Sequence, residues 1–169
     1  GSQWALDSMK ADGYADYDGY EEQLEELRSS VAQRTIEDWS RTVYDAWLYA
    51  LDATWVSRGA AFPDFMQTEA WTAKSHQTGF GSYTELKHDT ILYTKQAVAE
   101  GGNGEPPEPP RHWVEPEPVV YQRLANVTDL MQSGLDSRGL LPDEYAELLV
   151  DLRSFYEWLA GIAEDELAG

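Results

Sequence analysis

Hydrophobic residues recur along this chain with the period of α-helices. Tyr20, Leu24, Leu27 and Val31 are spaced by four, three and four positions, which predicts an amphipathic helix with an acidic outer face. A longer helix is predicted from a second stripe formed by Ile36, Trp39, Val43, Trp47, Leu51 and Trp55. The cleanest stripe comes last, with Tyr145, Leu148/Leu149, Leu152, Phe155/Tyr156, Leu159 and Ile162. No segment shows the strict alternation of a half-buried strand.

Capping residues indicate where several of these helices begin. Ser2 is a candidate cap for a short helix through Met9, which the Asp12-Gly13 turn signal would end. Asp18 with Glu21 three residues later has capping-box spacing, and Thr35 with Asp38 repeats it. These pairs predict helix starts just after residues 18 and 35.

The middle of the chain predicts a helical hairpin. Residues 67–76 have the pattern of a short helix, and Gly79 and Gly81 would end it. Ser82, with Glu85 three residues later, would then start a central helix that runs through Gln96. Two helices joined by so short a turn are expected to pack against each other.

Beyond residue 100 the composition changes abruptly. Residues 101–118 hold six prolines and four glutamates, so we expect a long acidic loop there. Pro118 suits the first position of a helix, which should run to about Ser133 before residues 134–139 break it. Pro142 would open the last helix. The expected fold is all-α: one domain over residues 1–169, a bundle of about five to seven helices.

The charge balance restricts the possible partners. The net charge is −19, and such a chain repels phosphate backbones, so we expect no nucleic-acid partner. No stretch is long and apolar enough to span a membrane, and the absence of cysteine excludes disulfides and thiolate metal sites. The sequence is compatible with a protein or small-molecule partner, and it does not determine the oligomeric state.

The predicted central helix carries the most concentrated group of ionisable side chains. Glu85, His88 and Asp89 lie at i, i+3 and i+4 and share one helical face, with Lys95 further along. These residues are the candidates for catalysis. The favoured interpretation is a buried structural network, in which Asp89 pairs with Lys74, Lys95 or Arg123 and His88 is a hydrogen-bonded core histidine. The alternatives are a ligand pocket and a divalent-metal site that His76, His112 or Glu115 would complete.

A second set of residues suggests ligand binding. Lys74 and Trp71 belong to the first helix of the predicted hairpin, while Trp113 and Glu115 lie near the end of the acidic loop. Trp113 is the aromatic residue expected to reach a ligand, because it lies in a loop, whereas Trp39, Trp47, Trp55 and Trp71 keep helical spacing and suit the core. No zinc motif of the His-Glu-x-x-His type is present, and we predict neither a metal nor a cofactor.

Several segments resemble one protein family. Residues 63–74 (PDFMQTEAWTAK) and 82–96 (SYTELKHDTILYTKQ) carry most of the likeness, with further pieces at residues 113–116 (WVEP) and 132–135 (QSGL). The chain resembles the family catalogued as domain of unknown function 3160, found mostly in large prokaryotic proteins. That family has no established activity, so the resemblance implies no catalytic residues.

The resemblance also bears on location and completeness. Family members are typically longer and often carry an export or lipoprotein signal, which implies an extracytoplasmic or cell-envelope protein of which this chain is a fragment. Gly1-Ser2 is typical of residues left by cloning, although the first six residues also loosely resemble family sequence. The leading hypothesis is a non-catalytic helical scaffold or interaction domain. The alternative is a ligand-binding or hydrolase-like domain that uses the cluster around His88.

Overall fold

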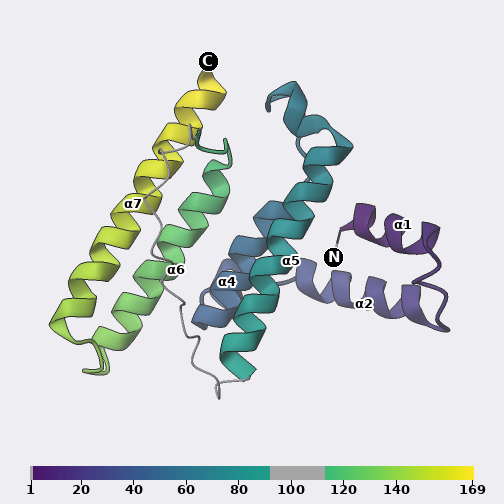
Figure 1. Ribbon diagram of the computed structural model, residues 1–169. Coiled ribbons are helices and arrows are strands. Elements are labelled where there is room, and N and C mark those ends of the chain that lie inside the picture. Colours follow the sequence, from purple (N-terminus) through teal and green to yellow (C-terminus); the bar gives the residue numbers. More distant parts are fainter. Residues whose placement is uncertain (1, 92–112) are drawn as a thin grey trace, which may run out of the picture.

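The protein is built from helices that pack side by side (Figure 1). The computed structural model describes residues 2–91 and 113–169, with the backbone alone for residues 89–91. Within those residues there are seven α-helices, two 3₁₀ helices and no strand, which confirms the all-α prediction. The elements are α1 (Gln3–Ala11), α2 (Tyr20–Ala32), α3 (Ile36–Trp39), α4 (Val43–Asp52), η1 (Ala53–Trp55), η2 (Asp64–Gln67), α5 (Glu69–Ile91), α6 (Pro118–Asp136) and α7 (Asp143–Ala168).

Small residues form the contact layer among α4, α6 and α7. Helix α6 lies between α7 and α4, and α5 lies on the other side of α4 (Figure 1). The buried side chains along this layer include Ala50, Ala125, Ala160 and Ala163. Alanine lets helix backbones approach closely, so a narrow apolar seam suffices to hold the three helices together.

Helix α5 is one continuous helix, so the predicted hairpin is wrong. Gly79 and Gly81 lie inside it, and Ser82 is not its cap. Gly79 is buried where α5 meets η1, and a Cβ there would lie 2.5 Å from Thr54 Oγ1 and 2.8 Å from Trp55 Cε2. The Ser82 hydroxyl oxygen instead accepts a hydrogen bond of 3.2 Å from Trp47 Nε1. Gly79 therefore permits close packing rather than ending the helix.

The helix predicted from Thr35 to Trp55 is interrupted. Thr35 and Asp38 form the predicted capping box, but α3 ends at Trp39. Thr42 then caps α4, because its hydroxyl oxygen accepts from the Asp45 backbone N–H at 3.0 Å. The Arg34 guanidinium bridges the two helices by donating to the Asp38 carbonyl oxygen at 3.0 Å and to Asp45 Oδ1 at 2.5 Å.

The N-terminal helices α1 and α2 lie at one end of the molecule, to the right in Figure 1. Ser2 caps α1 as predicted, accepting from the Ala5 N–H at 3.1 Å. Asp18 does not cap α2, because Gly19 occupies the cap position in the left-handed region at φ 73°. Helix α2 contains no fully buried residue. This pair of helices is therefore attached to the rest of the protein by few contacts.

Helices α6 and α7 form a hairpin. Pro118 lies at the first turn of α6, as predicted, but Gly134 does not break the helix, which continues to Asp136. The chain then reverses through Gly139 at φ 65°, and α7 begins after Pro142. Most of the predicted acidic loop, residues 101–112, lies outside the described residues.

Candidate functional site

The described part of the cluster predicted around His88 is exposed rather than buried. Glu85 and His88 both lie on α5 with exposed side chains, so the enclosed arrangement expected from the sequence is wrong for them. The side chain of Asp89 and all of Lys95 and His112 lie outside the described residues. Two of the three expected partners of Asp89 have other partners: Lys74 pairs with Glu115, and Arg123 pairs with Asp52 at 3.7 Å.

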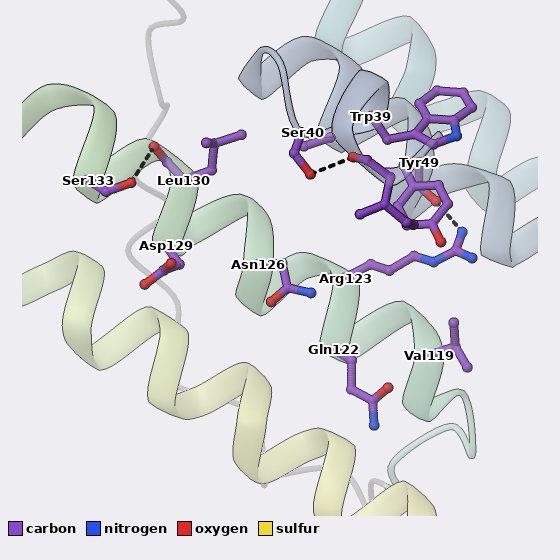
Figure 2. Close-up of a pocket in the computed structure, with 12 residues that line it drawn as sticks. Trp39, Ser40, Tyr49, Val119, Gln122, Arg123, Asn126, Asp129, Leu130 and Ser133 are labelled. Carbon is purple, nitrogen blue, oxygen red and sulfur yellow. Dashed lines mark hydrogen bonds between the residues drawn. The ribbon is translucent and has the colours of Figure 1, made fainter. Parts of the chain in front are cut away.

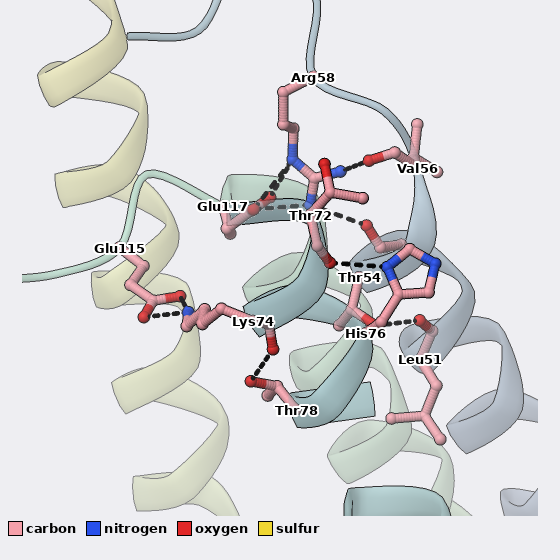
Figure 3. Close-up of polar contacts among 11 residues, drawn as sticks. Leu51, Thr54, Val56, Arg58, Thr72, Lys74, His76, Thr78, Glu115 and Glu117 are labelled. Atoms are coloured by element: carbon pink, nitrogen blue, oxygen red, sulfur yellow. Dashed lines mark hydrogen bonds and ion pairs between the residues drawn. The ribbon is translucent and has the colours of Figure 1, made fainter. Parts of the chain in front are cut away.

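His76, considered above as a metal ligand, has a structural role instead. Its side chain is only 4% exposed, and Nδ1 lies 2.7 Å from the Thr72 carbonyl oxygen, so Nδ1 carries the proton (Figure 3). The Ser2 hydroxyl lies 2.5 Å from Nε2 and donates to it when the ring is neutral. Both ring nitrogens are therefore occupied, and the bond to Ser2 connects the start of α1 to α5.

The structure brings together the four residues that the sequence suggested for ligand binding. Lys74 Nζ donates to both carboxylate oxygens of Glu115 (Figure 3) and lies 4.4 Å from the ring centroid of Trp71. The rings of Trp71 and Trp113 are 6.2 Å apart. The positive charge of Lys74 is thus shared between a carboxylate and an aromatic face. A ligand role for this group stays a prediction.

Phe65 completes an aromatic group around Trp71 and Trp113. Its ring packs edge-on against both, at 5.3 and 5.5 Å between centroids, and Phe65 and Trp113 are exposed. Trp71 Nε1 is buried and has no hydrogen-bond partner within the described part of the chain. The sequence analysis listed Trp71 and Trp113 as ligand-binding candidates but did not include Phe65.

A buried ion pair between Arg58 and Glu117 was missed by the sequence analysis. Arg58 Nη2 and Nε donate to Glu117 Oε1 at 2.6 and 2.9 Å, and the side chains are only 5% and 12% exposed (Figure 3). Arg58 also donates to the Ala53 carbonyl oxygen at 3.1 Å. This pair joins the loop after η1 to the start of α6. Arg58 lies in an irregular loop and Glu117 among prolines, so no periodic pattern marked either one.

Tyr121 lies beside these carboxylates. Burial raises the pKa of its hydroxyl above 10.0, and the negative charges of Glu115 and Glu117 raise it further. A cavity of about 170 Å³ opens here between α5 and α6, next to Lys74. Because Lys74, the cation among its described lining residues, is already paired with Glu115, the cavity offers no free positive charge to an anionic ligand.

A wider cleft of about 560 Å³ separates α3 and α4 from α6. Arg123 extends across it from α6 toward Tyr49, and Asn126 and Asp129 follow along the same helix (Figure 2). The Arg123 guanidinium stacks on the Tyr49 ring at 3.5 Å and donates to the Tyr49 carbonyl oxygen. Its charge is thus used to hold α4 against α6, so the cleft has no uncommitted cation.

The outer face of α7 carries an exposed apolar stripe. Tyr145, Leu148, Leu152 and Phe155 repeat every three and four residues, and their exposures are 53%, 60%, 40% and 49%. An amphipathic stripe normally faces the core. Here α7 instead buries Ala160 and Ala163, on a neighbouring face, against α6. No other described helix lies beside α7 (Figure 1). We call these four residues the α7 stripe.

Acidic residues flank the α7 stripe. Helix α7 contains eight acidic residues and a single basic one, Arg153. Arg153 is bonded to Glu157 at 2.9 Å and also pairs with Asp129 on α6. The neighbouring carboxylates raise the pKa of the Arg153 guanidinium above its usual value. The surface around the stripe is therefore strongly negative.

Residues 2–91 and 113–169 hold no group of three or more His, Asp or Glu side chains placed to bind a metal ion. Among the helices in those ranges, none has the length and apolar character needed to cross a membrane.

The whole sequence matches one family model. The model, described as "Protein of unknown function (DUF3160)", covers residues 1–169. No curated protein and no solved structure matches the chain.

Proposed function

We propose that this chain, which belongs to the DUF3160 family of proteins of unknown function, is a non-catalytic interaction domain that docks a partner helix on the α7 stripe. The observation that carries this proposal is the exposure of Tyr145, Leu148, Leu152 and Phe155. Exposed apolar surfaces of this kind mark interaction sites, and a heptad-like spacing suits another helix.

The charges around the α7 stripe define the chemistry of the partner. A second copy of this chain would bring two strongly acidic helices together, and like charges at such an interface oppose association. A partner helix with an apolar seam flanked by lysine or arginine matches the surface instead. The proposed partner is therefore a basic amphipathic helix that belongs to another protein.

Synthetic peptides test this proposal directly. One helical peptide carries a leucine seam flanked by lysines, and a second carries the same seam flanked by glutamates. We expect the lysine peptide to bind with an affinity that falls as salt rises, and the glutamate peptide not to bind. Fluorescence anisotropy of the labelled peptides measures both affinities.

Two variants of α7 provide a matched comparison. Leu152→Glu places a charge in the α7 stripe, whereas Val150→Glu places the same charge at an exposed position two residues away, on another face. Leu152→Glu should lower the affinity for the lysine peptide about tenfold or more, and Val150→Glu should change that affinity little. Equal effects of the two variants, or self-association of the protein through this face in sedimentation, would contradict the proposal.

The proposal also includes a location outside the cytoplasm. Its support is the resemblance to a family whose members often carry export signals. Fractionation of cells that produce the native protein, followed with an antibody against this chain, tests the location. Recovery from the cytoplasmic fraction alone would contradict it.

A further inference from the structure

A cavity of about 400 Å³ lies between the N-terminal helices and the rest of the protein. Leu6 of α1 and Leu24 of α2 line one side, and Leu48 of α4, Trp55 of η1 and Phe80 of α5 line the other. Its volume falls within the range of roughly 300–1,000 Å³ that is typical of small-molecule sites. It lies on the other side of α4 and α5 from the α7 stripe.

No carboxylate, ammonium or guanidinium group of the described residues lines this cavity, and both ring nitrogens of its lining residue His76 have hydrogen-bond partners. None of its described lining residues is Asp, Glu, Lys or Arg, and the lining is mainly aliphatic and aromatic. A buried ion without a counter-charge is costly, so this lining disfavours anions and cations alike. An anion would meet the added repulsion of a protein with net charge −19.

Polar groups on the wall are available for a directional contact, among them Trp55 Nε1, which is buried without a hydrogen-bond partner in the described residues, and the Tyr20 hydroxyl. Among the described residues, Tyr20 OH donates only to Met9 Sδ, at 3.6 Å, and a thioether sulfur is a weak acceptor. By contrast, the Ser2 hydroxyl is fully used, since it accepts from Ala5 and lies 2.5 Å from His76 Nε2. Tyr20 can therefore exchange its sulfur contact for a stronger oxygen acceptor supplied by a ligand.

Filling the cavity would stabilise the N-terminal helices. The wall atoms of an empty apolar cavity lose dispersion contacts, and helix α2 buries none of its own residues completely. Both α1 and α2 meet α4 and α5 around this space, so a bound molecule would contact both sides.

From these observations, we propose that the cavity binds an uncharged, mainly apolar small molecule with one carbonyl or hydroxyl oxygen, which accepts a hydrogen bond from Tyr20. The site is independent of helix docking on α7, and either proposal can fail without the other.

The neutral fluorophore N-phenyl-1-naphthylamine tests occupancy of the cavity in the full 169-residue chain. Leu24→Trp fills the cavity, whereas Leu27→Trp adds the same group at an exposed position of the same helix. We expect one molecule of probe per chain, about tenfold weaker binding with Leu24→Trp, and unchanged binding with Leu27→Trp. Leu152→Glu should leave the signal intact, which separates this site from the α7 stripe.

Competition identifies the ligand class. The neutral ketone 2-decanone should displace the probe at lower concentration than decanoate or decyltrimethylammonium. Tyr20→Phe should weaken binding of the ketone more than binding of the probe. Circular dichroism confirms that each variant folds, and Ala5→Phe serves as a second filling variant if Leu24→Trp does not. Absence of binding, binding that survives a folded filling variant, or preferential displacement by a charged competitor would each overturn the proposal.

Discussion

Gly79 and Gly81 lie two residues apart in α5 and have opposite surroundings. Gly79 is buried against Thr54 and Trp55, while nothing lies within 4 Å of the position that a Cβ of Gly81 would take. Both positions have helical backbone, so conformation alone does not require glycine at either. The difference is one of packing space.

Alanine substitutions at these two glycines should therefore have opposite effects. Gly79→Ala should lower the free energy of unfolding by about 1–3 kcal/mol, because the new methyl group displaces the Trp55 ring. Gly81→Ala should raise it by about 0.5–1 kcal/mol, because alanine favours helix. Urea titrations followed by circular dichroism measure both values. Stabilisation by both variants would show that Gly79 is not closely packed.

Glu117 should be among the most sensitive residues of the structure. Glu117→Gln leaves Arg58 buried without its counter-charge and should cost about 3–5 kcal/mol of unfolding free energy. Glu21→Gln, which removes the same charge from the exposed pair with Lys10, should cost only about 0–1 kcal/mol. Tryptophan fluorescence during guanidinium unfolding measures the two losses. Similar values for both would contradict the burial of the Arg58–Glu117 pair.

Helix starts depend on single carboxylates at the beginning of α3 and α4. At α4, the Thr42 hydroxyl donates to Asp45 at 2.6 Å, and Arg34 pairs with the same carboxylate. The Thr42 bond, followed by the bond from Arg34, lowers the pKa of Asp45 below its usual 3.8. The pKa of Asp38 is lowered too, chiefly by the Thr35 backbone N–H and then by its hydroxyl.

The lowered pKa of Asp45 gives a pH dependence with a definite sign. The folded state binds the proton of the Asp45 carboxyl less tightly than the unfolded state does. The stabilisation from this carboxylate is therefore complete above pH 3.8 and is lost as pH falls through the lower pKa of Asp45 in the folded state. The melting temperature of the wild type should exceed that of Asp45→Asn near neutral pH, and the difference should shrink toward about pH 3. Thermal scans across this range measure the difference. A difference that does not change with pH would contradict the assignment.

Local sequence signals correctly predicted the helix starts that are set by contacts between residues close together in the sequence. Ser2, Thr35 and Pro118 mark helix starts correctly, since capping and proline geometry involve only adjacent backbone. Gly79 was wrongly predicted to end a helix, because its role is to allow close contact with Trp55, which lies more than twenty residues away in sequence. Fold class could thus be predicted, whereas the interruption at residues 40–42 and the continuity of α5 could not.

The candidate sites show the same limit. The grouping of Lys74, Trp71, Trp113 and Glu115 could be anticipated from residue types, but the exposure of His88 could not. In α7, an apolar stripe and a contact with α6 are both present on neighbouring faces. Periodicity detects the stripe but does not say which face meets another helix.

At the scale of the whole molecule, the excess of negative charge opposes the folded state. A net charge of −19 on 169 residues produces self-repulsion that salt screens. The melting temperature should rise with sodium chloride, by about 2–4 °C for each kcal/mol of relieved repulsion. Choline chloride should act equally, because screening does not depend on the cation. A much larger effect of sodium would indicate a specific ion site instead.

The attachment of α1 and α2 through a few side chains predicts that the molecule opens in stages. Amide hydrogens of α2 should exchange with solvent while those of α6 remain protected, because α2 contains no fully buried residue. A protease that cleaves after residue 32 would remove both N-terminal helices and leave a fragment that contains α3 to α7.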